Sequence, residues 1–151
     1  MATTVTASTL SVKISESITL NGVSRNGGTT LSVASIKSIA SRIVEVTNAT
    51  NGTELITVST APGAGVYDRS SVKYMRVTNL DDTNFILLQF TDSSSHHWEA
   101  KLEAGKSYVI GDLSSIDDQA DIDNFSASAV AKVIAKADTA AVDVELYIAS
   151  T

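Results

Sequence analysis

Three neighbouring residues, His96, His97 and Trp98, are the first candidates for chemistry, because His96 and His97 are the only histidines of the chain. Histidine binds metals and transfers protons near neutral pH. Adjacent residues of a strand point to opposite faces, so the two imidazoles are poorly placed to chelate one ion, and the chain has no cysteine to complete a soft site. We therefore expect no metal site here, but surface turn residues with Trp98 in the core or at an interface.

A second candidate is an acidic cluster that carries hard oxygen ligands of the kind Ca²⁺ prefers. It consists of Asp117, Asp118, Asp121, Asp123 and Asn124. An EF-hand loop would also need a glycine at its sharp turn and a distal bidentate glutamate, and the cluster has neither. We expect a solvated loop that binds no metal.

Catalytic motifs are missing from the sequence. No serine lies in a Gly-x-Ser-x-Gly elbow, which positions the nucleophile in one large class of hydrolases. Glycosidases pair two carboxylates in a cleft with aromatic walls, whereas aromatic residues make up only 5% of this chain. We expect a protein without enzymatic activity, catalytic residues or a cofactor.

Composition limits the possible partners. A chain of 151 residues suits one domain with a substantial core, and the absence of cysteine leaves packing or association to stabilise it. The net charge of −6 disfavours nucleic acid, whose phosphates require clustered basic residues. No apolar run approaches the roughly 18 residues of a membrane span, and residues 1–10 lack the features of a signal peptide. We expect no membrane partner and assembly in the cytoplasm.

Strand patterns begin at Leu10, where apolar residues alternate with polar ones as far as Leu20 and predict a half-buried strand. Glu16 interrupts the apolar face and indicates either a β-bulge, which we favour, or a carboxylate facing another subunit. Asn21-Gly22 and the following Asn26-Gly27-Gly28 predict turns or an exposed loop. Residues 1–9 precede this strand, are polar and rich in threonine, and are expected to form an extended N-terminal arm.

The next segment, residues 31–46, has a mixed pattern that predicts a short helical or irregular turn leading into a strand. Asn51-Gly52 between two apolar runs predicts a hairpin that pairs residues 43–46 with residues 55–58. The segment 61–65 contains Pro62, the only proline, and is expected to be a loop at a sheet edge.

The central part of the chain predicts an antiparallel meander of four strands at residues 72–78, 85–90, 98–102 and 107–110. Asn, Asp, Ser and Gly clusters separate these runs and favour turns. Residues 85–90 are apolar on both faces, which is typical of a central strand covered on both sides.

The C-terminal part is less clear, since residues 127–137 fit either a helix or a strand. We favour a strand, because residues 142–148 alternate cleanly beyond a short turn at residues 137–140.

Several segments resemble small β-sandwich virion proteins of tailed bacteriophages, especially those that coat or clamp the head. The resemblance lies in Val72-Lys73-Tyr74-Met75-Arg76-Val77-Thr78-Asn79-Leu80-Asp81, in Thr83-Asn84-Phe85-Ile86-Leu87-Leu88, in Leu102-Glu103-Ala104-Gly105-Lys106-Ser107-Tyr108-Val109-Ile110, in the segment from Ala137 to Glu145 and in the Thr-rich opening. These segments span about half of the chain. The resemblance implies an all-β, antiparallel, jelly-roll-like sandwich, and it transfers no binding residue.

The expectation for the whole chain is an N-terminal arm at residues 1–9 followed by a single domain at residues 10–151. By resemblance, it is a homotrimeric capsid decoration or cement protein, located on the surface of the virion, with the major capsid protein as its partner. A tail, collar or fibre component is the nearest alternative. A carbohydrate-binding module is the alternative from another class, and it would depend on exposed aromatics such as Trp98 and Tyr108.

Overall fold

The computed structural model describes residues 4–61, 63–111, 113 and 130–151. Every regular element in these residues is a β-strand, so the predicted all-β class is confirmed. The strands are β1 (Ser8–Glu16), β2 (Thr19–Leu20), β3 (Val23–Ser24), β4 (Gly27–Ile36), β5 (Ser38–Val46), β6 (Thr53–Ser59), β7 (Val66–Asp68), β8 (Val72–Asn79), β9 (Ile86–Asp92), β10 (His97–Leu102), β11 (Ser107–Ile110), β12 (Val130–Ala137) and β13 (Val142–Ser150).

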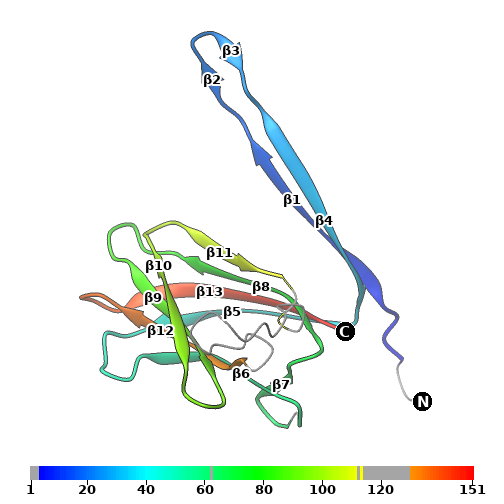
Figure 1. Cartoon of the computed structure of the whole chain (residues 1–151), viewed down its shortest axis with the longest axis vertical. Coiled ribbons are helices and arrows are strands. Elements are labelled where there is room, and N and C mark those ends of the chain that lie inside the picture. Colours follow the sequence, from blue (N-terminus) through cyan, green and yellow to red (C-terminus); the bar gives the residue numbers. More distant parts are fainter. Residues whose placement is uncertain (1–3, 62, 112, 114–129) are drawn as a thin grey trace.

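Two sheets form the body of the molecule and enclose its core between them (Figure 1). One is five-stranded in the order β10-β9-β12-β6-β7, and the other is four-stranded in the order β11-β8-β13-β5. All neighbours are antiparallel except β6 and β7. Inward side chains alternate along the strands, as in β13, where Val142, Val144, Leu146 and Ile148 are buried. This alternation puts one face of each sheet into a common core.

One buried polar side chain ties the ends of the two sheets together. Asn79, at the end of β8, is fully buried, and its Nδ2 donates to the carbonyls of Asn84 (2.8 Å) and Leu102 (3.3 Å). Its Oδ1 accepts a hydrogen bond from the backbone N–H of Asp81. Because donors and acceptor are all satisfied, the amide is accommodated in the core and fixes the turn between β8 and β9.

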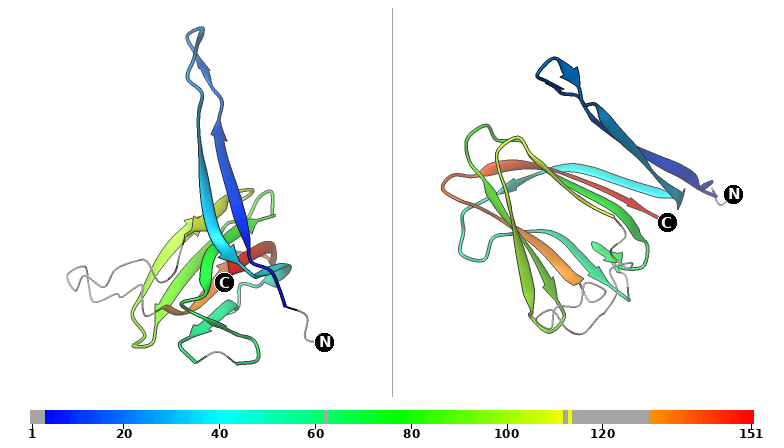
Figure 2. Two further views of the ribbon diagram at one scale, coloured as in Figure 1. Left: turned by 90° about the vertical axis from the view of Figure 1, so that its right-hand side faces the viewer. Right: turned by 45° about the horizontal axis from the view of Figure 1, so that its top comes forward.

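A long β-hairpin of β1 and β4 projects from the body, and the short pair β2 and β3 forms its tip (Figures 1 and 2). This arrangement corrects several predictions. The strand predicted at residues 10–20 is mostly exposed rather than half-buried, and the pairing register is regular at Glu16, where β1 ends, with an irregularity only between Ser8 and Leu10. The turn predicted within residues 31–46 takes its irregular form: Ser35 has φ of 64° and Lys37 lies between β4 and β5, so the segment holds two strands and no helix.

The predicted strands of the central part are confirmed, but their predicted pairing is wrong. Only β9 and β10 form one of the expected hairpins, whereas β8 pairs with β11 and β13 in the opposite sheet. The hairpin predicted across Asn51-Gly52 is also wrong, because β5 pairs with β13 and β6 pairs with β12. A turn sequence specifies that the chain reverses, but the strand that follows can cross to the other sheet to bury its apolar face.

The strand preferred over a helix at residues 127–137 is confirmed for Val130–Ala137, while residues 127–129 lie outside the described part. Residues 85–90 supply most of β9, which lies between β10 and β12 as expected of a central strand. Its inward side chains are buried, and Leu87 and Gln89 on the other face are half-buried. Pro62 and the acidic cluster at residues 117–124 also lie outside the described residues.

Candidate functional site: an amphipathic hairpin

The projecting hairpin has one apolar and one polar face. Cross-strand pairing places Leu10 opposite Val33 and Val12 opposite Leu31, and Ile14 follows on the same face. The opposite face carries Ser11 and Ser32, Lys13 and Thr30, and Ser15 and Gly28. An antiparallel pair with this alternation is built to cover an apolar surface with one face and to meet water with the other.

The hairpin reverses direction at Asn21-Gly22, as the sequence predicts. Asn21 has φ of 50° and Gly22 has φ of 74°, so both central residues are left-handed. Two such residues suit the twist of a tight hairpin and are favoured by Asn-Gly. The turn thereby sets Leu20 opposite Val23 at the tip.

The base of the hairpin packs on the outer face of the four-stranded sheet. A small second core forms there from Ile36, Tyr74 and Ala149, with Leu10, Val12, Val33 and Tyr147 packed against it. Tyr74 and Tyr147 meet edge to face with ring centroids 6.1 Å apart. Burial raises the pKa of the Tyr74 hydroxyl above its usual value of 10.0. The base is thus anchored to the body by aromatic and aliphatic contacts.

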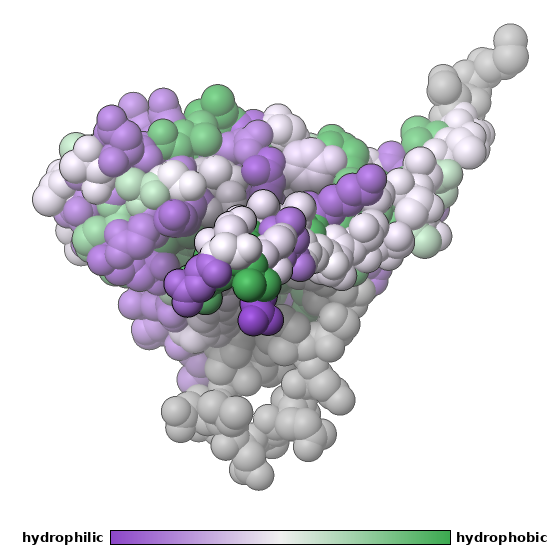
Figure 3. All heavy atoms as spheres, turned by 90° about the horizontal axis from the view of Figure 1, so that it is seen from above, coloured by the Kyte–Doolittle hydropathy of each residue, from purple (hydrophilic) through white to green (hydrophobic). Residues whose placement is uncertain are grey.

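The distal half of the same face has no cover in the described chain. Its apolar side chains are between 43% and 58% exposed: Ile14, Ile18, Leu20, Val23 and Leu31. Figure 3 views the molecule from the hairpin side and shows apolar groups at the exposed end of the ribbon. A two-stranded ribbon is marginally stable by itself in water, so this half needs a surface to rest on.

The outer face of the four-stranded sheet also carries exposed apolar residues beyond the hairpin base. On the edge strand β5, Ile39 is 49% and Ile43 is 64% exposed, and Val109 of the opposite edge strand β11 is 44% exposed. A cleft of about 250 Å³, lined by Leu10, Val12, Lys13, Arg76 and Tyr147 among others, separates the hairpin from this face.

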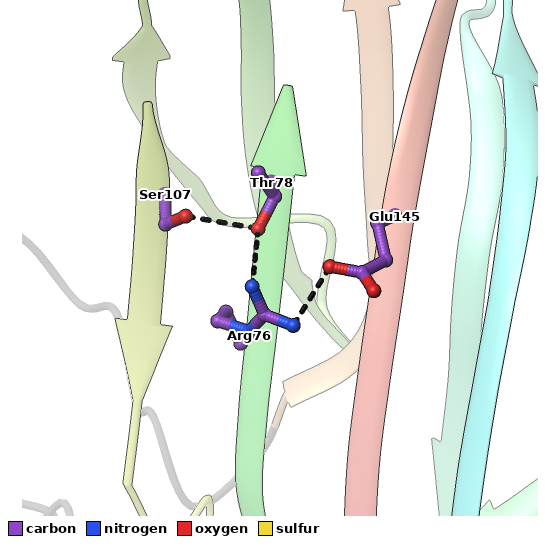
Figure 4. Close-up of polar contacts among 4 residues, drawn as sticks. All are labelled: Arg76, Thr78, Ser107 and Glu145. Carbon is purple, nitrogen blue, oxygen red and sulfur yellow. Dashed lines mark hydrogen bonds and ion pairs between the residues drawn. The ribbon is translucent and has the colours of Figure 1, made fainter. Parts of the chain in front are cut away.

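A polar network crosses the middle of that outer face (Figure 4). Arg76 donates from Nη2 to Glu145 Oε2 at 2.7 Å and from Nη1 to Thr78 Oγ1 at 3.0 Å, and the hydroxyls of Thr78 and Ser107 are 2.9 Å apart. The guanidinium also lies 5.9 Å from the centroid of the Tyr147 ring. These contacts join β11, β8 and β13 and hold the arginine across the face.

The two histidines occupy different positions. His96 lies in the turn before β10, with its Nδ1 2.9 Å from Asp92 Oδ2, while His97 is exposed at the start of β10. Asp92 Oδ1 also accepts hydrogen bonds from the backbone N–H groups of Ser94 and His96. Burial acts to raise the pKa of Asp92, but these hydrogen bonds outweigh it and hold the pKa below its usual 3.8. His96 is a turn residue as expected, whereas His97 already belongs to β10, and Asp92 organises the turn.

The aromatic residues on which a carbohydrate site would depend pack against one another. Trp98 stacks on Phe90 with centroids 4.2 Å apart, and Tyr108 lies 6.0 Å from Trp98 and 5.9 Å from Phe90. Trp98 and Tyr108 are half-buried and pack on the main core. One indole face is therefore used inside the fold rather than offered as a platform.

A cleft of about 490 Å³ lies beside β6 and β7. Arg42, Glu54, Thr57 and Tyr67 are its polar and aromatic lining, and Arg42 donates to the carbonyl of Leu55. Its lining contains no histidine or serine, and its one hydroxyl–carboxylate contact is the exposed hydrogen bond from Thr57 to Glu54. Among the described residues, no group of three or more His, Cys, Asp or Glu is placed to hold a metal ion.

Comparisons with family models, with curated proteins and with solved structures found no match to this chain. In the described part of the chain, no helix is long and apolar enough to cross a membrane.

The sequence contained a signal for the hairpin that our predictions did not use. Alternating apolar residues flank Asn21-Gly22 on both sides, and extending the two-residue turn outward gives the pairing observed from Leu20 and Val23 onward. What the sequence could not show is that this ribbon leaves the body. Residues 4–7 of the expected N-terminal arm are exposed and precede β1, which already includes Ser8 and Thr9.

Proposed function

We propose that the protein is a non-enzymatic structural component of a virion, which decorates the outer surface of a tailed-phage head and stabilises the shell. The projecting amphipathic hairpin is the observation that carries this proposal. It places an uncovered apolar surface on an arm outside the body, an arrangement suited to holding large assemblies together. The catalytic and ligating groups of the described residues do not converge in a comparable way.

The jelly-roll form of the fold belongs to the same proposal. With β5, β6 and β8 to β13 counted as strands one to eight, the sheets have the orders six-three-eight-one and five-four-seven-two. This order supports a jelly roll, in which two Greek keys alternate between two sheets, with β7 as an addition beside β6. Jelly rolls occur in viral capsids, and also in lectin domains and cupins, so the fold alone does not select the function.

The mechanism would be multivalent attachment. Copies placed around the symmetry axes of a shell each make modest contacts through the sheet surface, the hairpin and the N-terminal arm, and attachment of one contact raises the effective concentration of the next. A homotrimer would match a threefold position of the shell. The major capsid protein is the proposed partner.

Addition of the purified chain to heads of the encoding phage that lack it tests this function. We expect saturable co-sedimentation at a fixed copy number per head, and a higher temperature of head disruption once the sites are filled. Binding to tails or fibres alone would move the protein to that part of the virion. Retention on a glycan surface, lost in Trp98→Ala and Tyr108→Ala, together with no binding to virion parts, would instead support a carbohydrate-binding module.

A further inference from the structure

The distal half of the hairpin continues the apolar face whose proximal half is partly buried against the body. Leu10, Val12 and Val33 are covered by the sheet, whereas Ile14 and Leu31, next along the same face, are exposed. In Figures 1 and 2 the ribbon rises away from the body instead of lying flat along it. The exposed half therefore rests on nothing in the described part of the chain, and the surface of another chain can cover it.

The same chain carries a second unpartnered apolar surface of matching chemistry. Ile39 and Ile43 stand exposed on the outer face of β5, and β5 is the edge strand of its sheet. The cover that the hairpin base provides over Tyr74 and Ala149 does not extend to Ile43. One copy thus offers an apolar ribbon and another offers an apolar sheet face, which is the requirement for association of identical chains.

We propose that the distal apolar face of the hairpin docks on the outer face of the four-stranded sheet of a second copy of this chain, over Ile39 and Ile43 of β5. This inference rests on the proposed structural function and identifies the contact through which the copies associate. The contact joins different surfaces of the two partners, and a contact of this kind closes into a ring when its rotation permits. A twofold dimer that exchanges its hairpins is the smallest closed assembly of this kind, and a trimer is the next.

Charge supports this pairing. The hairpin carries Lys13 and Arg25 against a single acid, Glu16, which gives it a net positive charge in a chain whose net charge is −6; Lys13 lies on its polar face, and Glu16 lies on its apolar face with Ile14. The receiving face is acidic: Glu45 lies directly opposite Asp143 in the pairing of β5 with β13, and neither has an ion pair within the described residues. Like charges directly opposite each other destabilise a sheet. The hairpin of a second copy carries a net positive charge, so this acidic face attracts it more than it attracts a neutral or acidic partner.

Complementation between two variants tests the contact. The hairpin variant carries Ile14→Thr and Leu31→Thr, and the face variant carries Ile39→Thr and Ile43→Thr. Each replaces exposed side chains by a β-branched polar residue that retains strand propensity. Light scattering after gel filtration should give a multiple of 15.8 kDa for the wild type and a mass near 15.8 kDa for each variant. Loss of each buried aliphatic side chain should weaken association about tenfold or more.

An equimolar mixture of the two variants distinguishes the proposed contact from others. The hairpin variant keeps an intact sheet face and the face variant keeps an intact hairpin, so the mixture should form a complex of two chains. Leu87→Thr, which changes a half-buried leucine on the outer face of the five-stranded sheet, is the matched control and should retain the wild-type mass. Glu45→Lys should weaken association, and the wild-type complex should weaken as salt is raised.

Three results would overturn the inference: a monomeric wild type, a face variant with the wild-type mass, or a mixture that stays monomeric. The second result would indicate that hairpins pair with one another. Head binding is measured separately, so the two proposals fail in different ways. If the variants stay assembled and bind heads, only the proposed contact between copies is overturned. If the wild type assembles through the hairpin but binds no virion part, only the proposed function is overturned.

Discussion

At the scale of single residues, Asp92 shows how a buried carboxylate organises a turn. Its oxygens accept from the backbone N–H groups of Ser94 and His96 and contact the His96 ring, while Ser95 adopts a left-handed φ of 71°. Asp81 acts in the same way in the turn before β9, where hydrogen bonds from the backbone N–H groups of Asn84 and Thr83 lower its pKa. Both carboxylates must be ionised to accept these bonds fully.

Stability should therefore depend on pH through Asp92. Because its folded-state pKa lies below the unfolded value near 3.8, its contribution is complete above that pH and is lost as pH falls through the folded-state pKa. We expect Asp92→Asn to have a lower Tm than the wild type at pH 7, and this difference should shrink below about pH 4. Thermal melts followed by circular dichroism from pH 7 to pH 3 measure it.

The control is Asp82→Asn, since Asp82 is exposed and accepts only the side-chain hydroxyl of Thr83. Its Tm should stay close to that of the wild type across the range. A constant difference between the wild type and Asp92→Asn at every pH would contradict the role assigned to the ionised carboxylate.

At the scale of elements, the connection between β5 and β6 decides whether the chain crosses from one sheet to the other. Gly52 has φ of +65°, and its backbone packs directly on β12. An added Cβ would lie 2.7 Å from the carbonyl oxygen of Ala135 and 2.8 Å from Cγ2 of Ile134. Only glycine permits both the left-handed backbone and this close approach.

Gly52→Ala should accordingly destabilise the fold through strain and steric overlap together, by about 2–4 kcal/mol. Gly105→Ala is the matched control, because Gly105 has φ of +68° with nothing within 4 Å of the added Cβ. That variant should lose only the stability that a left-handed backbone costs a residue with a Cβ, about 1–2 kcal/mol. Urea denaturation of the two variants measures the difference, and equal losses would show that the approach to β12 is relaxed at no cost.

At the scale of the whole molecule, the body and the distal hairpin are stabilised by different surfaces. The main core lies between the two sheets and contains no residue of β1 to β4, whereas the hairpin base depends on the small cluster around Tyr74 and Ala149. The body can thus keep its core when the end of the hairpin is removed. The hairpin end, by contrast, has no stabilising contact of its own with the body among the described residues.

Replacement of residues 15–28 by a two-residue Asn-Gly turn tests this division. The shortened chain keeps Leu10, Val12 and Val33 at the base, so its Tm should fall by only a few degrees, in line with a loss of about 1 kcal/mol or less. It should lose self-association. Differential scanning calorimetry and light scattering on one preparation report both properties, and an unfolded product would show that the hairpin end contributes to the body.

The sequence by itself determined the class of structure and most strand positions, because alternation of apolar residues and turn chemistry are local properties. Residues 72–78, 98–102 and 107–110 were placed within a residue or so of β8, β10 and β11, and Asn21-Gly22 forms the turn it predicts. The candidate site could be predicted only in part from the sequence. The apolar residues around that turn indicate a strand pair, but whether their face is exposed depends on which other element packs against it.

Only the tertiary structure decided which strands pair and which apolar faces are left uncovered. The chain crosses between sheets after β5, β7, β8, β10, β11 and β12, and no local signal distinguishes a crossing through a short turn from a hairpin, because both use the same turn residues. Ile43 and Val44 are neighbours of similar polarity, yet Val44 packs on the core and Ile43 faces outward. Neighbours on a strand must point to opposite faces, and the packing of the five-stranded sheet on one face of β5 decides which of the two is buried.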